Sequence, residues 1–342
     1  MIELKSPTSG ALVPLQTEAQ KAFLKNEKHR AELDGKLTFR WYDLERVGED
    51  STIPLPVSFA WEGCEDEAAS YYLLISERED MKDSEAFITK KTAYEVYNLK
   101  AGTRYFWCVR QNGKSSRVFS FQTEGALPRF IKLDAISNVR DMGGYAVEGG
   151  RIRQGLLYRG GEFELHCHLT EEGAGTLRRL GIHTELDMRG EAIGKVEFTS
   201  AEALGVRRVL VPSVPYSGIF KEENRKNVRS FFKTLAHKSY YPIYFHCWGG
   251  ADRTGTFAFV IGAFLGMSLG ALIDDYELTS LSVWGTRTRN YGLFQEFLAD
   301  FNALSGATLK EKARTFLKEY ADLTDKELET LFAVLVEEKT ER

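Results

Sequence analysis

The chain has 342 residues, of which 43% are hydrophobic and 27% are charged, and its formal net charge is −4. This length and composition are typical of a globular protein with room for two domains and without a disordered charged tail. The small negative charge argues against nonspecific nucleic-acid binding, which usually shows as a basic face. Since no stretch approaches about eighteen uninterrupted apolar residues, the sequence predicts no membrane span.

Residues 1–35 are expected to form an N-terminal segment with one helix. Thr17 to Leu33 is a charged amphipathic stretch that Thr17 can cap and Gly35 can end. The start of the chain lacks the basic residues and apolar core of a secretory signal, and the four cysteines show no disulfide framework. Unless a signal has already been removed, we expect a cytoplasmic protein.

Residues 36–124 carry short segments in which aromatic and branched residues alternate with polar ones, with turn residues between them. This pattern predicts an all-β antiparallel sandwich. Packing of the aromatic side chains in the sandwich core is the simpler expectation, and a carbohydrate-binding platform is the alternative. The expected strands are Leu37–Trp41, Val57–Trp61, Tyr71–Ile75, Ala93–Tyr97, Tyr105–Val109 and Arg117–Phe121.

The same region resembles a fibronectin type III domain over about a quarter of the chain. By that resemblance it would be a binding module or a spacer, with a protein or a glycan as its partner. The residues that carry the resemblance are Pro56, Trp61, Tyr72, Leu99–Gly102, Tyr105, Trp107 and Phe119–Thr123.

Glu124 to Arg129 is the expected linker, because it combines Gly125 with Pro128. Over residues 128–342, strands and helices alternate, which predicts an α/β domain with a mostly parallel central sheet flanked by helices. Expected strands are Ile182–Asp187, Val206–Val211 and Pro242–Phe245, and expected helices are Thr170–Leu180, Glu222–His237, Thr256–Met267, Tyr291–Leu304, Thr308–Tyr320 and Thr324–Glu338.

The loop between the strand at 242–245 and the helix at 256–267 has the composition of a phosphate-binding site. Gly249, Gly250 and Gly255 leave the backbone open, so that N–H groups can form an anion-binding nest at the helix start. Arg253 can bind two phosphate oxygens with its planar fork. Convergent donors of this kind suit a phosphate dianion.

Cys247 is the expected nucleophile, because a cysteine beside a helix N-terminus and an arginine exists largely as thiolate. Thr254 can donate to that sulfur when it leaves, and His246 is expected to orient the loop rather than to act as a base. The alternative is a buried structural cysteine that merely follows a strand. The spaced Arg253 and the loop glycines argue against that alternative.

The spacing His246-Cys247, five residues, Arg253 and Thr254 resembles the signature of the cysteine-dependent protein tyrosine phosphatases. Further segments are similar, in order, to a bacterial branch of tyrosine and dual-specificity phosphatases over about residues 130–340. These segments are Asn138–Tyr145, Tyr158–Gly161, Leu169–Gly173, Asp187–Glu191 and Asp275–Thr279.

The resemblance implies a phosphatase fold, a phosphocysteine intermediate and no cofactor or metal. The substrate would be a phosphorylated protein or a small phosphomonoester. The implied phosphate-binding residues are Trp248, Gly249, Gly250, Ala251, Thr254 and Gly255, and Asn138, Arg140 and Asp141 are implied framework or rim residues.

A phosphatase also needs an acid to protonate the leaving oxygen. The loop 212–218 holds no carboxylate, and in the similar bacterial branch the aspartate before the signature arginine takes this role, which here is Asp252. The alternative is that Asp252 pairs with an arginine. Asp187 and Arg189 follow a strand end, where open α/β sheets place their sites. Arg189 is expected either to attract substrate or to form an internal salt bridge with Asp187.

Other polar groups near the predicted site carry weaker signals. Trp284, Arg287 and Arg289 are expected at a basic aromatic rim or at the surface. His166-Cys167-His168 lacks the fourth ligand that structural zinc normally needs, so no metal is expected there.

Two other functions stay open at this stage. One is a phosphoinositide or inositol polyphosphate phosphatase of the same mechanism, which is weakened because Ala251 stands where the bacterial branch commonly has lysine. The other is an inert, phosphate-dependent binding module, which the presence of both Cys247 and Arg253 disfavours. A sulfurtransferase also uses a looped cysteine, but the arginine spacing fits phosphate better.

Overall fold

The structure of the chain is a computed structural model, which describes residues 2–35, 50–63, 69–190 and 199–338. The chain divides into two compact units. The first, here called the β unit, comprises Met1–Thr17 and Pro54–Arg129, and the second, here called the α/β unit, comprises Glu18–Ile53 and Phe130–Arg342. The expected strand Leu37–Trp41 and Cys64 lie outside the described residues.

These units differ from the expected division at residue 35. Residues before Thr17 belong with the β unit because two short N-terminal strands pair with its later strands. Glu18–Ile53, in contrast, belongs with the α/β unit. Each unit is therefore built from two separate stretches of the chain.

The β unit consists of two sheets that share one aromatic core. The first has the order β1 (Glu3–Ser6), β3 (Val57–Glu62), β6 (Ala93–Val96). The second has the order β2 (Ala11–Val13), β9 (Phe119–Thr123), β7 (Arg104–Gln111), β4 (Tyr71–Ser76), β5 (Glu85–Thr89), with β8 (Lys114–Ser115) paired to β7. The pairing of β2 with β9 is parallel, whereas the other strand pairs of these two sheets are antiparallel.

The aromatic side chains of the β unit mostly pack inside it. Phe59 meets Trp107 edge-on at 5.0 Å between ring centroids, and Tyr105 stacks on Phe121 at 5.6 Å. These four side chains are all at most 5% exposed. The expectation of core packing is thus confirmed for them, while Tyr72 is 45% exposed.

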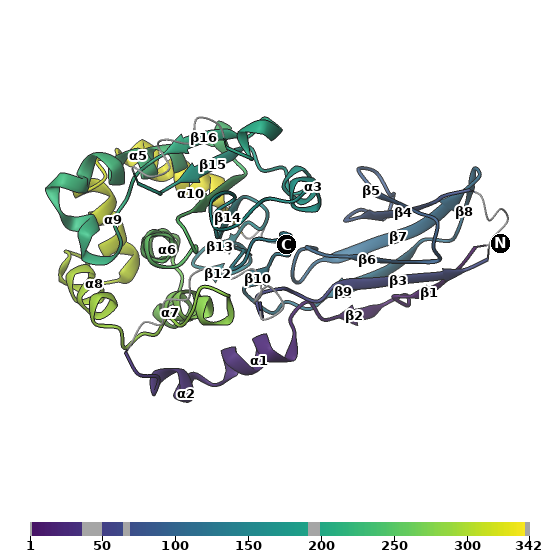
Figure 1. The fold of residues 1–342 in the computed structure, drawn as a ribbon, viewed down its shortest axis with the longest axis horizontal. Coiled ribbons are helices and arrows are strands. Elements are labelled where there is room, and N and C mark those ends of the chain that lie inside the picture. Colours follow the sequence, from purple (N-terminus) through teal and green to yellow (C-terminus); the bar gives the residue numbers. More distant parts are fainter. Residues whose placement is uncertain (1, 36–49, 64–68, 191–198, 339–342) are drawn as a thin grey trace. The chain divides into compact units, whose positions relative to one another are not determined.

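The α/β unit is organised around a mostly parallel sheet (Figure 1). The sheet has the order β10 (Arg129–Phe130), β11 (Arg140–Asp141), β14 (Leu157–Gly160), β17 (Ile243–His246), β15 (Thr184–Asp187), β16 (Arg207–Leu210). The pairs β14–β17, β17–β15 and β15–β16 are parallel, and β11 runs antiparallel to β14. The carboxyl ends of the three central strands therefore meet at one edge.

Helices and a small second sheet complete the α/β unit. The helices are α1 (Glu18–Lys25), α2 (Glu27–Ala31), α3 (Glu171–Arg179), α5 (Arg225–Leu235), α6 (Asp252–Leu265), α7 (Leu269–Glu277), α8 (Gly292–Ala303), α9 (Leu309–Glu319) and α10 (Asp325–Leu335). Short 3-10 helices lie at Glu202–Leu204, Tyr216–Phe220, Glu222–Asn224, Lys238–Tyr240 and Leu278–Leu281. The small sheet is β12 (Ala146–Val147), β13 (Gly150–Ile152) and β18 (Val336–Glu338).

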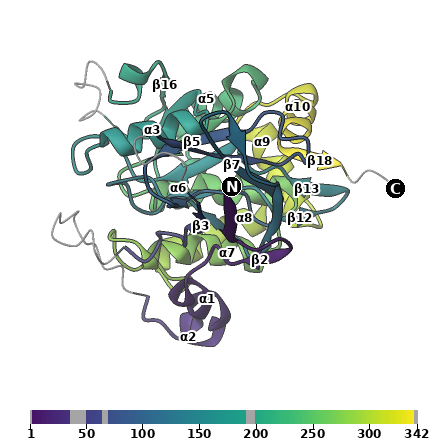
Figure 2. The ribbon, with the colours of Figure 1, turned by 90° about the vertical axis from the view of Figure 1, so that its right-hand side faces the viewer.

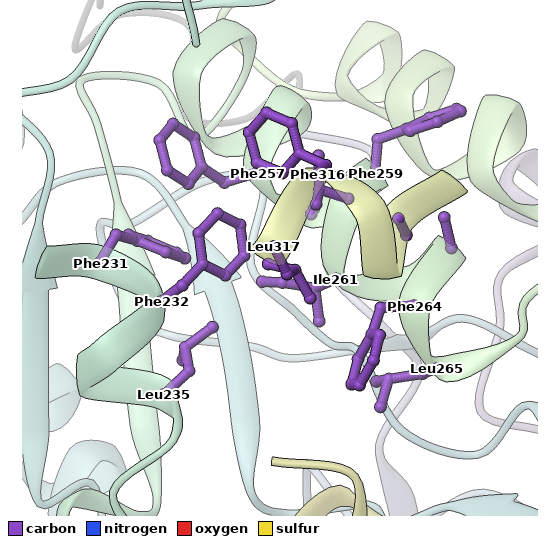
Figure 3. Close-up of a cluster of buried hydrophobic side chains, with 14 of the residues drawn as sticks. Phe231, Phe232, Leu235, Phe257, Phe259, Ile261, Phe264, Leu265, Phe316 and Leu317 are labelled. Carbon is purple, nitrogen blue, oxygen red and sulfur yellow. The ribbon is translucent and has the colours of Figure 1, made fainter. Parts of the chain in front are cut away.

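The core around α6 explains why this helix is apolar on every side. Phenylalanines of α5, α6 and α9 interlock in one cluster, which Figure 3 shows. Phe257 stacks on Phe232 at 5.6 Å between ring centroids, and Phe232 meets Phe316 at 6.0 Å. Burial of these side chains holds the start of α6 rigidly. The predicted phosphate-binding loop leads directly into this helix.

Three helix predictions need correction. The expected helix Thr256–Met267 is α6, which begins at Asp252, so Arg253 and Gly255 lie in its first turn and not in the preceding loop. The expected helix Thr17–Leu33 is two helices, because Asn26 interrupts it and accepts a hydrogen bond from the His29 N–H as the cap of α2. The expected helix Thr324–Glu338 ends at Leu335, since the following residues pair with β13 as β18. The predicted capping box of Thr324 with Glu327 is confirmed.

Among the described residues, no helix combines the length and the apolar character that crossing a membrane would require.

Candidate active site

The candidate site lies where β14, β17 and β15 end side by side. His246 is in register with Gly160 on one side and with Asp187 on the other. The chain leaves β17 at His246, passes through the loop 247–251 and enters α6 at Asp252. Residues 247–251, here called the phosphate loop, therefore lie at the carboxyl edge of the sheet, where open α/β folds place their sites.

The first two carbonyl groups of the phosphate loop are held from outside. The carbonyl oxygen of Cys247 lies 2.9 Å from Nδ1 of His246, and that of Trp248 accepts the N–H of Glu162 at 2.9 Å. Glu185 lies 2.8 Å from the other ring nitrogen of His246 and so fixes its orientation. Burial lowers the pKa of His246, but Glu185 and Asp187 raise it above the ordinary value of 6.5.

The next two carbonyl groups are held in the same way. Nδ2 of Asn138 donates to the carbonyl of Gly249 at 2.8 Å, and Nη2 of Arg159 donates to that of Gly250 at 2.7 Å. All four peptide groups are trans, so each following N–H points away from the anchored carbonyl. The N–H groups of residues 248–251 therefore face the side opposite the anchors, as an anion-binding nest requires.

Two loop glycines are required by space. At Gly250, φ is +64° and a Cβ would lie 2.2 Å from the Gly160 carbonyl oxygen. At Gly249, a Cβ would lie 2.6 Å from the indole of Trp284. A side chain at either position would push the loop away from β14 or from Trp284.

Cys247 has the electrostatic surroundings of a nucleophile. Its side chain is 4% exposed, and burial alone raises the pKa of its thiol. The positive charge of Arg253 and the nearby hydroxyl and N–H groups of Thr254 outweigh burial, so the net pKa is lower than the ordinary value of 9.0. The Thr254 hydroxyl is buried without a hydrogen-bond partner among the described residues, so its proton is available to the sulfur.

Arg253 is the cation that is open to a ligand. It is half-buried, and its Nη1 donates to the carbonyl oxygen of Met188 at 3.0 Å. Within the described part of the chain, no carboxylate lies within ion-pair distance of this guanidinium. A phosphate can therefore take the remaining donors without displacing a carboxylate.

Asp252 is paired with an arginine. Nε and Nη2 of Arg287 donate to its two carboxylate oxygens at 2.7 and 2.8 Å, and the Tyr216 hydroxyl also donates to it. Tyr216 in turn lies 2.8 Å from the hydroxyl of Tyr276. Burial, followed by the charge of Asp252, raises the pKa of Tyr216 far above its ordinary value. The sequence left this pairing open as the alternative to an acid.

Arg189 is enclosed by carboxylates and forms the internal salt bridge that was one of its two expected roles. It donates to Asp187 at 2.9 Å through Nε, to Glu164 at 2.8 Å through Nη2, and to Glu162 through Nη1. Its guanidinium also lies 5.6 Å from the ring of Trp248. Burial raises the pKa of Asp187, but His246 and Arg189 outweigh it and hold that pKa well below its ordinary value.

The expected framework residues separate into two places. Arg140 donates to Asp275 at 2.6 Å and to Oδ1 of Asn138 at 2.6 Å, so both Arg140 and Asn138 support the phosphate loop. Asp141 supports a different segment. Its carboxylate instead accepts the N–H groups of Gly143 and Gly155, each at 2.7 Å, and closes a turn.

A scan against protein-family models matches residues 131–337 to the family described as the tyrosine phosphatase family. The match covers more than half of the chain. The chain belongs to the tyrosine phosphatase family. The matched segment, here called the phosphatase domain after its family, occupies most of the α/β unit.

Two similar proteins illustrate this membership. A protein of Cupriavidus necator, provisionally named a tyrosine-protein phosphatase, is 30% identical over 172 residues, which cover 43% of this chain and 61% of that protein. The chain thus spans about three fifths of the length of this relative. A crystal structure of the core catalytic domain of the PP-IP phosphatase SIW14 from S. cerevisiae, in complex with citrate, covers 46% of this chain and 85% of its own, with 17% identity and a TM-score of 0.31. That low TM-score gives no information on the substrate.

The phosphatase domain uses supporting residues that sequence reasoning did not single out. Arg159 binds the loop carbonyl of Gly250, and Asp275 holds both Arg159 and Arg140. Glu162 and Glu185 hold the loop through its first two carbonyls. The signal for Arg159 and Asp275 was present, because both lie in segments that carried the family resemblance.

The residues expected at a basic aromatic rim are mostly engaged within the phosphatase domain. Arg287 is 1% exposed and binds Asp252, so it lies neither at a rim nor at the surface. Arg289 is bound by Glu277 at 2.8 Å. Trp284 is buried against Gly249. The ring of His166 instead lies 4.8 Å from that of Trp248, measured between centroids. These two rings together form an aromatic surface at the phosphate loop.

One cluster in the phosphatase domain has metal-ligand chemistry. Ligand atoms of Glu185, Asp187 and His246 lie within 4.8 Å of one another. Glu185 is already bonded to His246, however, and Asp187 accepts two hydrogen bonds from the Arg189 side chain. Because the arginine supplies the positive charge that these carboxylates need, the arrangement fits a buried ion-pair network better than a metal centre.

Proposed function

We propose that the protein is a metal-independent phosphomonoesterase of the tyrosine or dual-specificity type that works through a phosphocysteine. The observation that carries this proposal is the set of four anchored carbonyls in the loop that starts at Cys247, which turns the following N–H groups away from the anchors. Beside it stands Arg253, which no described carboxylate binds. Such a cradle suits the equatorial oxygens of a phosphoryl group, which carry the charge in the transition state.

The reaction has two steps. The Cys247 thiolate attacks phosphorus in line, the bond from phosphorus to the leaving oxygen breaks, and that oxygen takes a proton. Water then attacks the phosphocysteine, so that the S–P bond breaks and inorganic phosphate and the thiolate are released. Arg253 and the loop N–H groups hold the phosphoryl oxygens in both steps, while the Thr254 hydroxyl stabilises the departing sulfur.

Asp252 is our candidate for the proton donor, since it opens α6 beside the loop and is 17% exposed. The guanidinium of Arg287 binds the carboxylate form of Asp252. Asp252 can therefore donate a proton only after the substrate or solvent has delivered one to the cluster of Tyr216, Asp252 and Arg287. A purely structural role, in which Asp252 holds Arg287 and Tyr216 under the loop, is the competing assignment.

The variant Asp252→Asn separates these two roles. If Asp252 is the acid, kcat is expected to fall by about 10²- to 10⁴-fold for phenyl phosphate, whose leaving group needs a proton. The loss is expected to be much smaller for para-nitrophenyl phosphate, and the basic limb of the pH profile should disappear. Equal losses for both substrates, with the pH profile unchanged in shape, would assign Asp252 to the structural role.

The rim of the loop supports an aryl monophosphate as substrate. Trp248 and His166 are both half-buried and offer ring surface beside the loop, whereas Ala251 is 2% exposed and supplies no charge for a second phosphate. The nearby guanidinium groups of Arg189 and Arg287 are already bound by carboxylates. A polyphosphate would therefore find one open guanidinium among the described residues of the loop's surroundings.

We expect kcat/KM for a phosphotyrosyl peptide to exceed that for inositol hexakisphosphate by at least about 100-fold. The reason is that the additional phosphate groups find no partner at the site, which costs about 3 kcal/mol in transition-state binding. The measurement is phosphate release from both substrates under identical conditions with EDTA present. Faster turnover of the inositol phosphate would transfer the proposal to an inositol polyphosphatase. Tight phosphate binding without turnover of either compound would indicate an inert binding module.

For the β unit, we propose a fibronectin type III-like domain that serves as a spacer or binds a protein or a glycan. Support comes from the order of aromatic and turn residues in the sequence and from the two sheets around one aromatic core.

A further inference from the structure

Residues 18–35 and 50–53, here called the strap, precede the segment that matches the phosphatase family, yet they belong to the α/β unit. Figures 1 and 2 show α1 and α2, in purple, beside α7. Gln20 is fully buried, and its Nε2 donates to the carbonyls of Ser51 and Ile53 at 2.9 Å each. The N–H of Ser51 donates to the carbonyl of Leu281 at 2.9 Å.

One route leads from the strap to the phosphate loop through Thr52. This side chain is 2% exposed, donates to Asp50 at 2.5 Å and accepts the N–H of Asn138 at 3.1 Å. Asn138 has a left-handed φ of +66°, which places its N–H on Thr52 while its Nδ2 holds the carbonyl of Gly249. Thr52 is thus two hydrogen bonds away from the loop.

A second route starts at Arg30 in α2. Arg30 is 1% exposed and donates to Asp274 at 2.7 Å and to Glu277 at 3.0 Å, both on α7. The same helix carries Asp275, which binds Arg159, the residue that holds the carbonyl of Gly250. Two separate chains of contacts therefore connect the strap with neighbouring peptides of the phosphate loop.

We propose that the strap is part of the catalytic machinery and that Thr52 is a positioning residue, which holds Asn138 and thereby the Gly249 peptide in the anion-binding orientation. This inference rests on the proposed phosphatase function for its meaning. The physical reason is the cost of an unpaired buried donor. Without the Thr52 hydroxyl, the buried N–H of Asn138 loses its acceptor, and the turn can recover one only by moving.

The decisive variant is Thr52→Val, which keeps the shape of the side chain and removes its hydroxyl. We expect about tenfold lower kcat/KM for para-nitrophenyl phosphate and about tenfold weaker inhibition by inorganic phosphate. Thr52→Ser keeps the hydroxyl and should stay within about twofold of the wild type. Thr123→Val is the matched control, because the Thr123 hydroxyl likewise accepts one N–H, from Thr103 at 2.9 Å, but lies in the β unit. Its own proton faces the carbonyls of Lys100 at 2.6 Å and Thr103 at 3.2 Å.

A second readout needs no turnover. The rate at which iodoacetate alkylates Cys247, followed by mass spectrometry of its peptide, rises as pH increases through the thiol pKa and then levels off. Because the surroundings lower the pKa of the folded-state thiol, we expect the wild-type midpoint below the ordinary value of 9.0. In Thr52→Val the midpoint is expected to move upward, since the loop's N–H groups and its helix start no longer stabilise the thiolate as well.

The outcomes are distinguishable. If Thr52→Val lowers only the melting temperature, as Thr123→Val does, and leaves the alkylation midpoint and phosphate inhibition unchanged, the strap is merely structural and the inference is wrong. If the wild type lacks turnover, the proposed function fails, while the alkylation midpoint still decides the role of Thr52. If Thr52→Val does not fold, Gln20→Met, which releases the 50–53 segment, must raise the same midpoint, and an unchanged midpoint overturns the inference.

Discussion

Replacing Cys247 by serine is expected to lower kcat for para-nitrophenyl phosphate by at least about 10⁴-fold, because the nucleophile is removed and the remaining donors only bind the substrate. A serine hydroxyl stays protonated in the surroundings that lower the pKa of the Cys247 thiol. The measurement is the initial rate in the presence of EDTA at several pH values. If the variant loses turnover but still binds inorganic phosphate, the cysteine is established as the nucleophile.

The matched control is Cys108→Ser, since Cys108 is also buried, at 1% exposed, but lies on β7 of the β unit. We expect its kcat to match the wild type. If Cys247→Ser turned over the substrate at the wild-type rate, the phosphocysteine mechanism would be wrong, and the loop would have to act only as a phosphate cradle.

Arg253→Lys should lower kcat/KM by about 10³-fold while the protein stays folded. A lysine keeps the charge but loses the planar fork that binds two phosphoryl oxygens together, and its ammonium is more strongly hydrated. The loss should appear mainly in kcat, because the fork is most useful when charge develops in the transition state. The alkylation midpoint of Cys247 should change little, since a positive charge still stands beside the thiolate.

A surface arginine provides the comparison for this second variant. Arg225 pairs with Asp322 at 2.7 Å and its side chain is 36% exposed, so Arg225→Lys should leave kcat/KM within about twofold of the wild type. If Arg253→Lys had an equally small effect, the guanidinium would contribute charge alone. The donor geometry would then come entirely from the loop N–H groups.

The supporting residues are costly to bury, which suggests why so many occur together. Arg140, Arg159 and Arg189 are at most 1% exposed, and each is met by at least one carboxylate. Replacing such pairs with apolar side chains is often neutral for stability, so stability alone does not explain them. Their hydrogen bonds are directional, however. Arg159 donates to the loop carbonyl of Gly250, and Arg140 orients Asn138, which donates to that of Gly249. Under the proposed function, the property that these buried charges provide is a rigid loop for binding phosphate.

Several features of the site followed from residues that are neighbours in the sequence. The strand, the phosphate loop and the start of α6 form one continuous stretch, so the order Cys247, glycines, Arg253 was enough to predict a nucleophile, a nest and a phosphate-binding fork. The capping box of Thr324 with Glu327 is similarly local. In each case the interacting groups are a few residues apart, and a turn of backbone brings them together whatever the rest of the chain does.

Other features depended on residues that are remote in the sequence, and only the tertiary structure decided them. Asp252 meets Arg287, 35 positions later, and Asn138 meets Gly249, 111 positions later. The expected domain boundary at residue 35 differs from the observed units for the same reason. Arg30 pairs with Asp274, 244 positions away, and so belongs with the α/β unit. A pattern of residue types shows that a carboxylate or an amide is present, but its partner is selected by the packing of strands and helices. By itself the sequence was enough to predict the chemistry of the phosphate loop, and the fold determined which buried groups hold that loop in place.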